Sequence, residues 1–523
     1  MYDAILIGSG HNCLVAATLL AKAGWKVGLF ERDETIGGAV RTEEWTLPGF
    51  KHDVASAAHI FFLISPFYHQ MRGELEKHGL RYRFFPTPMA CVFPDGSTLC
   101  LHRDLEATLD SLGRECADDA AAWKMLFDLY KKLAPDIVTL FSSPLPSVAA
   151  MTALGGARMK LGPERSLELA RMAVMSARAF ASRFFRSSKV QSWFATWAGH
   201  SGHGPDTAGG GFLSWITMGA SQDRESGLAV PEGGSGQLTL ALAGLVRSLG
   251  GEIHTGARVT RVIVDNNVAK GVELADGTRV EAHRAIIAGV APTSLFGDLV
   301  DEKHLPTILL DQVRRYRYGV SVFKIDLALD RPPEWKAGQP VGQAGIVHLS
   351  CTMNGMARAY TQAAEGLLPT EPLIIVGQPG VADPSRAPEG KAILWVIVFA
   401  APYEVSGDAA GKLTARSWEH LKERYADRVV DTIDGYAPGL KQSVLARRVM
   451  SPEDIQEMNP NLVAGDASAG SSHLDQLYVF RPVPNCSRYA TPIGRLYLTG
   501  ASTHPGSGVG GFSGYIVAKM LLS

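Results

Sequence analysis

A pair of glycine-rich turns, one near each end of the chain, constrains the fold more than any other feature. The chain begins with a short apolar run, 4–7, which leads into Gly8-Ser-Gly10 and then into a segment with helical apolar spacing, 12–23. Near the other end, the apolar run 495–499 leads into the glycine-rich segment 500–511 and a last helical segment. Strand, glycine turn and helix in this order bring a helix N-terminus against a phosphate group. Two such turns predict one dinucleotide that is held from both ends of the chain.

The first turn has nearly all the parts of a dinucleotide site. Gly8 supplies the tight turn, and Gly10 lets the backbone approach a pyrophosphate. The next predicted strand, 25–30, ends at Glu31, where an acidic side chain accepts hydrogen bonds from ribose hydroxyls. Cys13 stands where the third glycine is usual, and we expect its small thiol to fit with a slight shift of the helix. The alternative is a βαβ unit without a ligand, but Gly-Ser-Gly after a buried strand costs stability unless something approaches the backbone.

A second glycine pair, Gly37-Gly38, follows this unit and is close to Arg41. The backbone amides of the pair and the Arg41 guanidinium are suited to a phosphate or to the edge of a flavin. Arg41 as a plain surface cation explains the sequence equally well. Both interpretations stay open.

The carboxy-terminal segment Gly506-Ser-Gly508-Val-Gly-Gly511 also has dinucleotide-turn spacing. Only twelve residues follow Gly511, too few for the helix, strand and acid that complete a second unit. The sequence therefore predicts one dinucleotide and no separate NAD(P)H domain. FAD is favoured over NAD because the carboxy-terminal turn needs a part of the ligand that the first turn cannot reach.

Length and composition narrow the class of protein. A chain of 523 residues predicts two or three domains, and a formal net charge of −1 gives no electrostatic case for nucleic-acid binding. The six cysteines include no Cys-x-x-Cys pair, which excludes a thioredoxin-like dithiol and a thiolate zinc site. We expect a cytoplasmic protein, because free cysteines suit a reducing compartment and the first strand begins at residue 2, which leaves no room for a signal peptide. The cysteines are Cys13, Cys91, Cys100, Cys116, Cys351 and Cys486.

Neither a metal site nor a membrane span is predicted. His52 and His59 have poor spacing for a helical metal pair. His200 and His203 could be ligands, but a glycine-rich loop between the lid helices is favoured. The longest uncharged run, 137–157, is long enough to span a bilayer, but Pro144 and Pro146 interrupt it. We expect a loop and a short helix there.

The middle of the chain predicts a discontinuous nucleotide domain. Strands at 258–264, 268–274 and 278–282 form a meander, and 284–289 is a further buried strand. This meander between Rossmann strands resembles the glutathione reductase-type flavin domain, in which the backbone of Val259 would face the adenine.

The predicted fold class is α/β: a Rossmann-like, glutathione reductase-type FAD-binding domain with an inserted α+β substrate domain that carries a helical lid. The FAD-binding domain comprises residues 1–75, 225–295 and 480–523, the helical part of the substrate domain 76–224, and its sheet-containing part 296–479. In the last part, strand 321–329 alternates only partly, so we expect one face to meet the core and the other to line a cavity.

Several motifs resemble those of one flavoprotein family. The opening Gly-Ser-Gly-His-Asn, the Gly37-Gly38 segment and Gly500-Ala-Ser-Thr-His-Pro-Gly are similar to the phytoene desaturase and carotenoid isomerase family, within the amine oxidase and phytoene desaturase superfamily. Residues 472–484 resemble the pyridine nucleotide-disulfide oxidoreductase domain-containing protein 2 group more closely still. The resemblance implies FAD and leaves the substrate open. The predicted cofactor-binding residues are Gly8, Gly10, His11, Asn12, Glu31, Arg32, Gly37, Gly38, Arg41, Val259, Gly500, Ala501, Gly510 and Gly511.

The candidate catalytic and substrate residues are less specific. His504 would lie against the isoalloxazine if the resemblance holds, as a general base or, as Pro505 and the neighbouring glycines favour, as a turn residue. For His11, structural hydrogen bonding is favoured over catalysis. Gln476, Tyr478 and Arg481 are candidates for the border of a substrate cavity, and they fit strand positions equally well.

The function expected from these features is an FAD-dependent dehydrogenase or desaturase. It would take hydride from an apolar, cyclic or polyene substrate onto flavin N5 and be re-oxidised by oxygen or a quinone. Flavin-dependent amine oxidation, isomerisation by reduced flavin without net redox, and a non-catalytic FAD-stabilised binding protein are the alternatives. Eight basic residues between 158 and 189, against two acids, fit a peripheral contact with an anionic membrane, although a solvated face of a lid helix is favoured. The oligomeric state is open.

Overall fold

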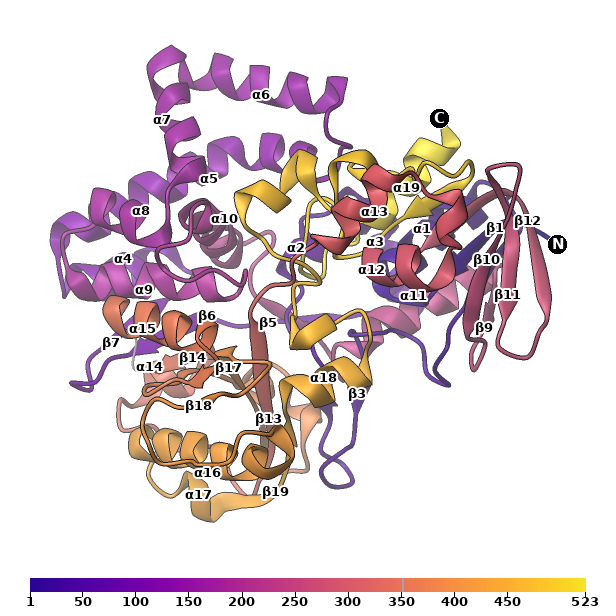
Figure 1. The fold of residues 1–523 in the computed structure, drawn as a ribbon. Coiled ribbons are helices and arrows are strands. Elements are labelled where there is room, and N and C mark those ends of the chain that lie inside the picture. The colour runs from indigo at the N-terminus through magenta and orange to yellow at the C-terminus, as the bar shows by residue number, and fades with distance from the viewer. Residues whose placement is uncertain (350–351) are drawn as a thin grey trace.

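The computed structural model describes residues 1–349 and 352–523, so Cys351 lies outside the described residues. Two seven-stranded sheets, three two-stranded sheets and a group of helices make up the described residues, and both chain ends lie beside the first seven-stranded sheet (Figure 1). The predicted α/β class with a Rossmann-like nucleotide-binding part is confirmed.

The first sheet is built from segments that are far apart in the sequence. Its parallel part has the order β20 (Leu496–Leu498), β12 (Arg279–Ala288), β1 (Tyr2–Ile7), β2 (Val27–Phe30) and β9 (Glu252–His254). Ile286 of β12 pairs with Ile5 on one side and with Leu496 on the other. The first and last strands of the chain therefore flank the same strand of one sheet.

A meander extends from this sheet. β10 (Val259–Asp265) and β11 (Val268–Leu274) run antiparallel to each other, and β11 pairs with the first half of β12. The two separate strands expected at 278–282 and 284–289 are one continuous strand, β12. The first half of β12 pairs with the meander, and its polar and apolar residues alternate. The second half pairs with the parallel sheet and is buried.

Helices cover one face of the first sheet. α1 (His11–Lys22), α3 (Pro66–Lys77), α11 (Gly236–Ser248) and α19 (Phe512–Leu522) share one hydrophobic core with β1 and β2. α1 and α19 pack so closely that a Cβ on Gly514 would lie 1.9 Å from the carbonyl oxygen of Asn12. The glycine at 514 thus lets the last helix lie against the start of the first.

The second sheet has the order β19 (Val444–Met450), β13 (Ser321–Leu329), β17 (Ala392–Ala401), β16 (Leu373–Gly377), β14 (Ala344–Leu349), β6 (Thr87–Val92) and β7 (Thr98–Leu101). Two of these strands, β6 and β7, come from the range 76–224, which was expected to be mainly helical. On one face of the sheet, Phe323, Ile325 and Leu327 pack on α16 (Trp418–Tyr436). The alternate residues Val322 and Lys324 line a cavity, as the partial alternation of β13 predicts.

The helical part stands above the second sheet (Figure 1). It contains α4 (Leu105–Gly113), α5 (Ala117–Phe141), α6 (Val148–Leu161), α7 (Pro163–Val174), α8 (Ala177–Phe184), α9 (Ser188–Gly199) and α10 (Gly210–Gln222). The uncharged run 137–157 covers the end of α5, a turn and the first part of α6. In the described residues, no helix combines the length and the apolarity that crossing a bilayer requires.

Candidate active site

A cavity of about 350 Å³ lies where the two glycine turns, the second sheet and the helical part meet. His11 and Asn12 of the first turn line it, together with the 505–513 segment of the second. The two chain ends therefore enclose one space, as the sequence predicts. Other lining residues used below are Asp53, Trp197, His200, Val322, Lys324, Ile346, Tyr360, Trp395, Ile397, Phe399, Leu477, Ala501, Gly510 and Gly511.

The first glycine turn has the geometry of a phosphate cradle. Gly8 has φ +93°, which favours glycine, and a Cβ on Gly10 would meet no protein atom within 4 Å. Gly10 directly precedes α1, so its open side is next to the positive end of that helix. The residues present fit the pyrophosphate of a dinucleotide.

Glu31 and Gly37 are fixed against this turn. Ser9 donates to one Glu31 carboxylate oxygen from its backbone N (2.8 Å) and from its Oγ (2.6 Å), and Ser9 Oγ accepts from the backbone N of Gly37 (3.0 Å). A Cβ on Gly38 would lie 3.7 Å from Gly10 Cα. The three predicted segments therefore meet at one point. The other Glu31 oxygen, Oε1, accepts from the backbone N of Asp33 (3.1 Å) and keeps a lone pair for a further donor.

Cys13 fits at the place of the third glycine because the residue that faces it, Gly289, has no side chain. Its thiol lies 3.7 Å from the carbonyl oxygen of Ile7, and a Cβ on Gly289 would lie 2.3 Å from Cys13 Sγ. In the family pattern, a glycine on the helix allows close packing of helix and strand. In this chain, Gly289 at the end of β12 provides that space. The sequence alone did not indicate this exchange.

The second glycine turn is held by hydroxyl groups. Ser513 Oγ accepts from the backbone N of Gly500 (2.9 Å) and lies 2.8 Å from Thr499 Oγ1 and 2.7 Å from Thr503 Oγ1. This network fixes the beginning of α19 against the end of β20. Ala501, Gly510 and Gly511 line the cavity from this side.

The remaining predicted cofactor residues lie outside the cavity lining. Arg32 donates to Asp33, and Arg41 donates to Thr35 Oγ1 (2.8 Å) and also lies near Asp33 and Glu43. Val259 is buried in the core between the meander and the first sheet. Two residues before it, the backbone N of Ala257 donates to the carbonyl oxygen of Glu31 (2.7 Å). Their contacts with a cofactor stay predictions.

His504 is not among the described residues that line the cavity. Its Nε2 lies 3.0 Å from the carbonyl oxygen of Leu140 in α5, and burial lowers its pKa to about 4. Tyr489 in turn donates to the carbonyl oxygen of His504. The geometry is that of a packed turn residue, the alternative favoured from the sequence.

None of the three candidate substrate residues belongs to the described cavity lining. Gln476 and Arg481 hydrogen-bond to the backbone instead. Gln476 accepts from the backbone N of Arg317 and donates to its carbonyl oxygen. Tyr478, whose pKa burial raises to about 12, lies in the short helical turn after it, and Leu477 between them lines the cavity. Arg481 is fully buried and bonds to backbone carbonyl oxygens.

Lys324 is a cavity residue that the sequence reasoning missed. It extends from β13 into the cavity and forms an ion pair with Asp326 of the same strand, whose other oxygen lies 3.6 Å from His52 Nδ1. Burial raises the pKa of Asp326, but Lys324 and His52 outweigh that effect and hold it below its usual value. The alternation Val322, Lys324, Asp326 along one strand was the available signal.

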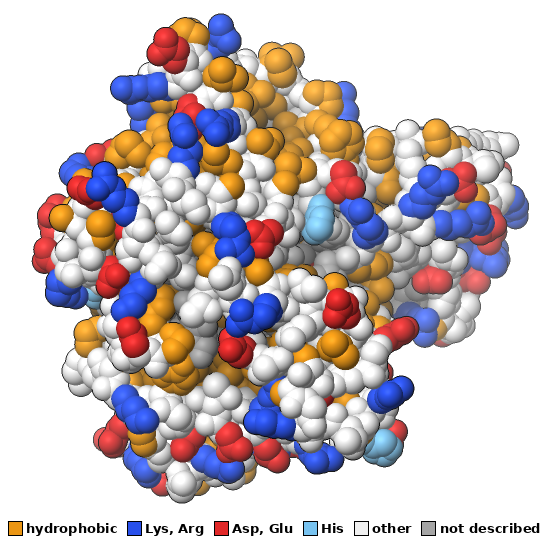
Figure 2. Space-filling model, turned by 60° about the vertical axis from the view of Figure 1, so that its left-hand side comes forward, with side chains coloured by type: hydrophobic (Ala, Val, Ile, Leu, Met, Phe, Trp, Pro, Cys, Tyr) orange, Lys and Arg blue, Asp and Glu red, His pale blue; other side chains and the backbone are white. Residues whose placement is uncertain are grey.

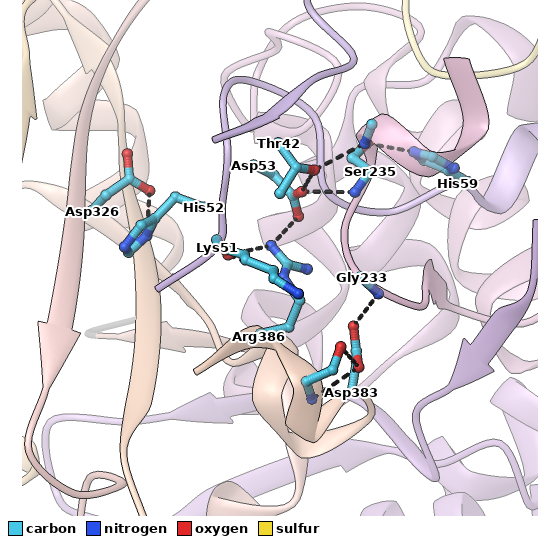
Figure 3. A network of polar contacts seen from close by, with 12 residues as sticks. Thr42, Lys51, His52, Asp53, His59, Gly233, Ser235, Asp326, Asp383 and Arg386 are labelled. Carbon is cyan, nitrogen blue, oxygen red and sulfur yellow. Dashed lines mark hydrogen bonds and ion pairs between the residues drawn. The ribbon is translucent and has the colours of Figure 1, made fainter. Parts of the chain in front are cut away.

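A second buried network joins the nucleotide-binding segments to the sheet-containing part (Figure 3). Asp53, which lines the cavity, accepts from Thr42 Oγ1 and from the backbone N of Ser235, both at 2.7 Å, and pairs with Arg386 at 2.9 Å. Ser235 Oγ lies 2.7 Å from His59 Nε2. Arg386 belongs to the sheet-containing part, so this network fixes that part against the nucleotide-binding segments.

The histidines considered as metal ligands have other partners. His59 contacts Tyr82 and Ser235, and His203 Nε2 lies 2.8 Å from the carbonyl oxygen of Ser472. His200 Nε2 lies 2.9 Å from His348 Nε2. Within 1–349 and 352–523, no three His, Cys, Asp or Glu side chains form a group that could hold a metal ion.

The profile of the flavin containing amine oxidoreductase family matches residues 14–512. The chain belongs to this family. It is an FAD-dependent oxidoreductase, and the glycine cradle and the shared cavity fit that cofactor. The family membership confirms the resemblance noted in the sequence.

Individual relatives match along the whole chain. Pyridine nucleotide-disulfide oxidoreductase domain-containing protein 2 of Mus musculus is 32% identical, over 99% of this chain and 93% of its own. A limonene dehydrogenase component of Castellaniella defragrans is 26% identical, over 99% and 94%. The crystal structure of an oxidoreductase from Methanosarcina mazei has a TM-score of 0.64 at 15% identity, over 99% of both chains, and shows the same fold.

Proposed function

We propose that this flavoenzyme is a dehydrogenase or desaturase for a neutral, lipophilic substrate, cyclic or polyene. The observation that carries the proposal is the wall formed by the second sheet. Ile346, Trp395, Ile397 and Phe399 present one continuous apolar face to the cavity. Pockets of this kind bury the apolar body of a ligand and orient it with few polar groups.

The charges of the cavity favour a neutral substrate over an amine. Asp53 is the carboxylate among the described lining residues, and Arg386 already pairs with it. Lys324 in the wall already pairs with Asp326. A substrate ammonium group would thus find no free carboxylate among the described lining residues, which costs binding energy in a buried site.

Bound FAD supplies hydride acceptance, and the chain supplies orientation, exclusion of water and proton handling. The apolar wall and the helices above it hold the substrate away from water. Lys324, with Asp326 and His52 behind it, forms a buried chain of groups that can hold or move a proton at the cavity wall. The names of the limonene dehydrogenase component and of a phytoene desaturase of Pseudescherichia vulneris support a lipophilic substrate with a cyclic or polyene body.

Anaerobic reduction of the bound flavin tests the proposal. The flavin-loaded protein is mixed with cyclic terpenes, carotenoid-like lipids, cyclic ketones or primary amines, and the flavin absorbance is followed. We expect bleaching by apolar compounds, and recovery of absorbance when oxygen or a quinone is then added. Bleaching by amines alone would establish the amine oxidase alternative. Absence of bleaching by every class would leave an isomerase or a binding protein, separated by product analysis with chemically reduced flavin.

We also propose that α6 and α7 contact an anionic membrane surface and so give access to such a substrate. Six large apolar side chains of these helices are exposed, namely Val148, Met151, Leu154, Met159, Leu167 and Val174. Arg158, Arg165 and Arg171 are exposed among them. Figure 2 shows apolar and basic side chains mixed over the upper part of the molecule, where these helices lie. Apolar groups with interspersed cations are typical of interfacial helices.

A further inference from the structure

Four side chains at one end of the cavity form what we call the distal polar cluster: Trp197, His200, His348 and Tyr360. Trp197 and His200 come from the end of α9 and the residue after it, His348 from β14, and Tyr360 from α15 (Met353–Ala364). The ring centroids of Trp197 and His200 are 4.7 Å apart, and those of His200 and His348 5.2 Å. Trp197, His200 and Tyr360 line the cavity, and His348 and Tyr360 line a pocket of about 20 Å³ that shares Gly199 and Phe399 with it.

Three polar atoms of this cluster are buried and lack a hydrogen-bond partner among the described residues: Trp197 Nε1, His348 Nδ1 and the Tyr360 hydroxyl. Trp197 and His348 are each only 2% exposed. Buried polar atoms are nearly always paired with protein or an ordered small molecule, because an unpaired one costs the full desolvation of the group. Three such atoms in one cluster at a cavity wall therefore point to a ligand that completes them.

Two glycines create the space for this arrangement. A Cβ on Gly199 would lie 3.1 Å from the Phe399 ring and 3.6 Å from the Tyr360 hydroxyl. A Cβ on Gly204 would lie 3.1 Å from the Tyr360 ring. The contacts with the two rings are too close for the neighbours to stay in place unchanged, so the chain keeps side chains away where the Tyr360 ring enters.

The cluster is uncharged. Burial lowers the pKa of His200 to about 4, and burial and the neighbouring His200 lower that of His348 well below its usual value, so both imidazoles are neutral near pH 7. The charged lining groups of the cavity, Asp53 and Lys324, belong to other parts of its wall. Trp197 Nε1 is a donor only, so the ligand atom that it meets is an acceptor.

The cluster is far from Lys324 along the sheet. Lys324 pairs with Ile397, Ile397 with Ile375, and Ile375 with His348, so the two residues are in one row across four strands. Three strand spacings of about 4.8 Å put the two positions roughly 14 Å apart. Between them Ile397 lines the cavity. An occupant that reaches both ends is thus apolar in its middle.

We propose that the distal polar cluster binds a neutral oxygen, an alcohol or a ketone, at one end of an otherwise apolar substrate. The proposal rests on the dehydrogenase function above and narrows its substrate class to oxygenated lipophiles. A pure hydrocarbon leaves the three polar atoms unpaired. A carboxylate or an ammonium group meets no opposite charge there.

Binding of matched straight-chain probes tests this independently of turnover. Flavin-loaded protein is titrated with 1-dodecanol, 2-dodecanone, dodecane, dodecylamine and dodecanoate, and binding is followed by the perturbation of the oxidised flavin spectrum. Tyr360→Phe should weaken binding of the alcohol and ketone about tenfold and leave that of dodecane unchanged. Tyr403→Phe, at a half-buried tyrosine outside the cavity lining, is the matched control and should change neither. The affinity of each probe is compared between the native protein and the variant, so differences in hydrophobicity between the probes cancel.

The outcomes separate this proposal from the function on which it rests. Equal loss of alcohol and dodecane binding in Tyr360→Phe would mean a packing role and overturn the subsite, as would tightest binding of the amine or carboxylate. Bleaching of the flavin by hydrocarbons with no Tyr360 dependence would keep the dehydrogenase and refute the subsite. Tyr360-dependent alcohol binding without bleaching by any compound would keep the subsite and refute the dehydrogenase.

Discussion

Arg481 donates to the carbonyl oxygen of Ala501 from both Nε and Nη2, at 3.1 and 2.8 Å. The same guanidinium donates to the carbonyl oxygens of Ser468 and Ser471, each at 2.9 Å. Arg481 is fully buried, and within the described residues it forms no ion pair with a carboxylate. Arg481 therefore links the 468–471 loop to the turn that contains Ala501, a residue of the cavity lining. Its effect on the site is to hold this backbone in place.

Replacing Arg481 by lysine should destabilise this turn. A single ammonium group cannot reach carbonyl oxygens on both sides, so buried acceptors lose their donors, at a cost of about 3 kcal/mol. Denaturant unfolding and the flavin-to-protein ratio measure the effect. Arg317→Lys, at an exposed arginine paired with Asp475, is the control and should change the free energy of unfolding by less than about 1 kcal/mol. Unchanged stability with a raised KM would instead support the substrate contact expected from the sequence.

The sequence predicts the nucleotide-binding part well because its signals are local. Gly8, Gly10 and Glu31 are close in the chain, and their roles follow from a strand, a turn and a helix in order. The cavity wall could not be predicted in this way. Lys324, His200 and Tyr360 come from different elements, and only the packing of α9 and α15 against the second sheet brings them to one space.

Loss of flavin should follow from Gly10→Leu. The open side of Gly10, where a Cβ meets no protein atom within 4 Å, is where the pyrophosphate is expected, so a leucine side chain would take that space. Gly73→Leu is the control, because Gly73 also has open space and lies on the exposed face of helix α3. We expect purified Gly10→Leu to be folded by circular dichroism and colourless, and Gly73→Leu to be yellow. Full flavin content in Gly10→Leu would refute the cradle.

Variants of Lys324 and Asp326 should show whether this ion pair serves stability, the reaction or both. Lys324→Met leaves the Asp326 carboxylate buried with less compensation and should lower the free energy of unfolding by about 3 kcal/mol. Replacing both residues, Lys324→Met with Asp326→Leu, removes the uncompensated charge and should recover most of that loss. If the pair handles the substrate proton, both variants should reduce their flavin about 100-fold more slowly than the native protein. A double variant with native reduction rates would assign the pair to structure alone.

Vesicle binding tests the surface of α6 and α7. The triple change Met151→Ser, Met159→Ser and Leu167→Ser removes side chains that are 63%, 84% and 74% exposed, so folding should be unaffected. Sedimentation with vesicles that contain anionic lipid should show binding that falls with salt, and the triple variant should bind at least about tenfold more weakly. Ile308→Ser with Leu445→Ser, exposed elsewhere, serves as the control. If the native protein stays in the supernatant at low salt, α6 and α7 present a solvated face and do not contact the membrane.

Acid should destabilise the protein through its buried neutral histidines. Burial lowers the pKa of His203 and His504 to about 4, below the value of about 6.5 in an unfolded chain. The unfolded state therefore binds more protons between these values, so the stabilisation is complete above about pH 6.5 and is lost as the pH falls towards 4. Each such histidine should cost about 1 kcal/mol at pH 5.5. Thermal unfolding between pH 7.5 and 4.5 measures the loss. His203→Gln, which keeps a donor for the Ser472 carbonyl oxygen, should show a shallower decline, and an identical slope would show that His203 is protonated as easily in the folded state as in the unfolded one.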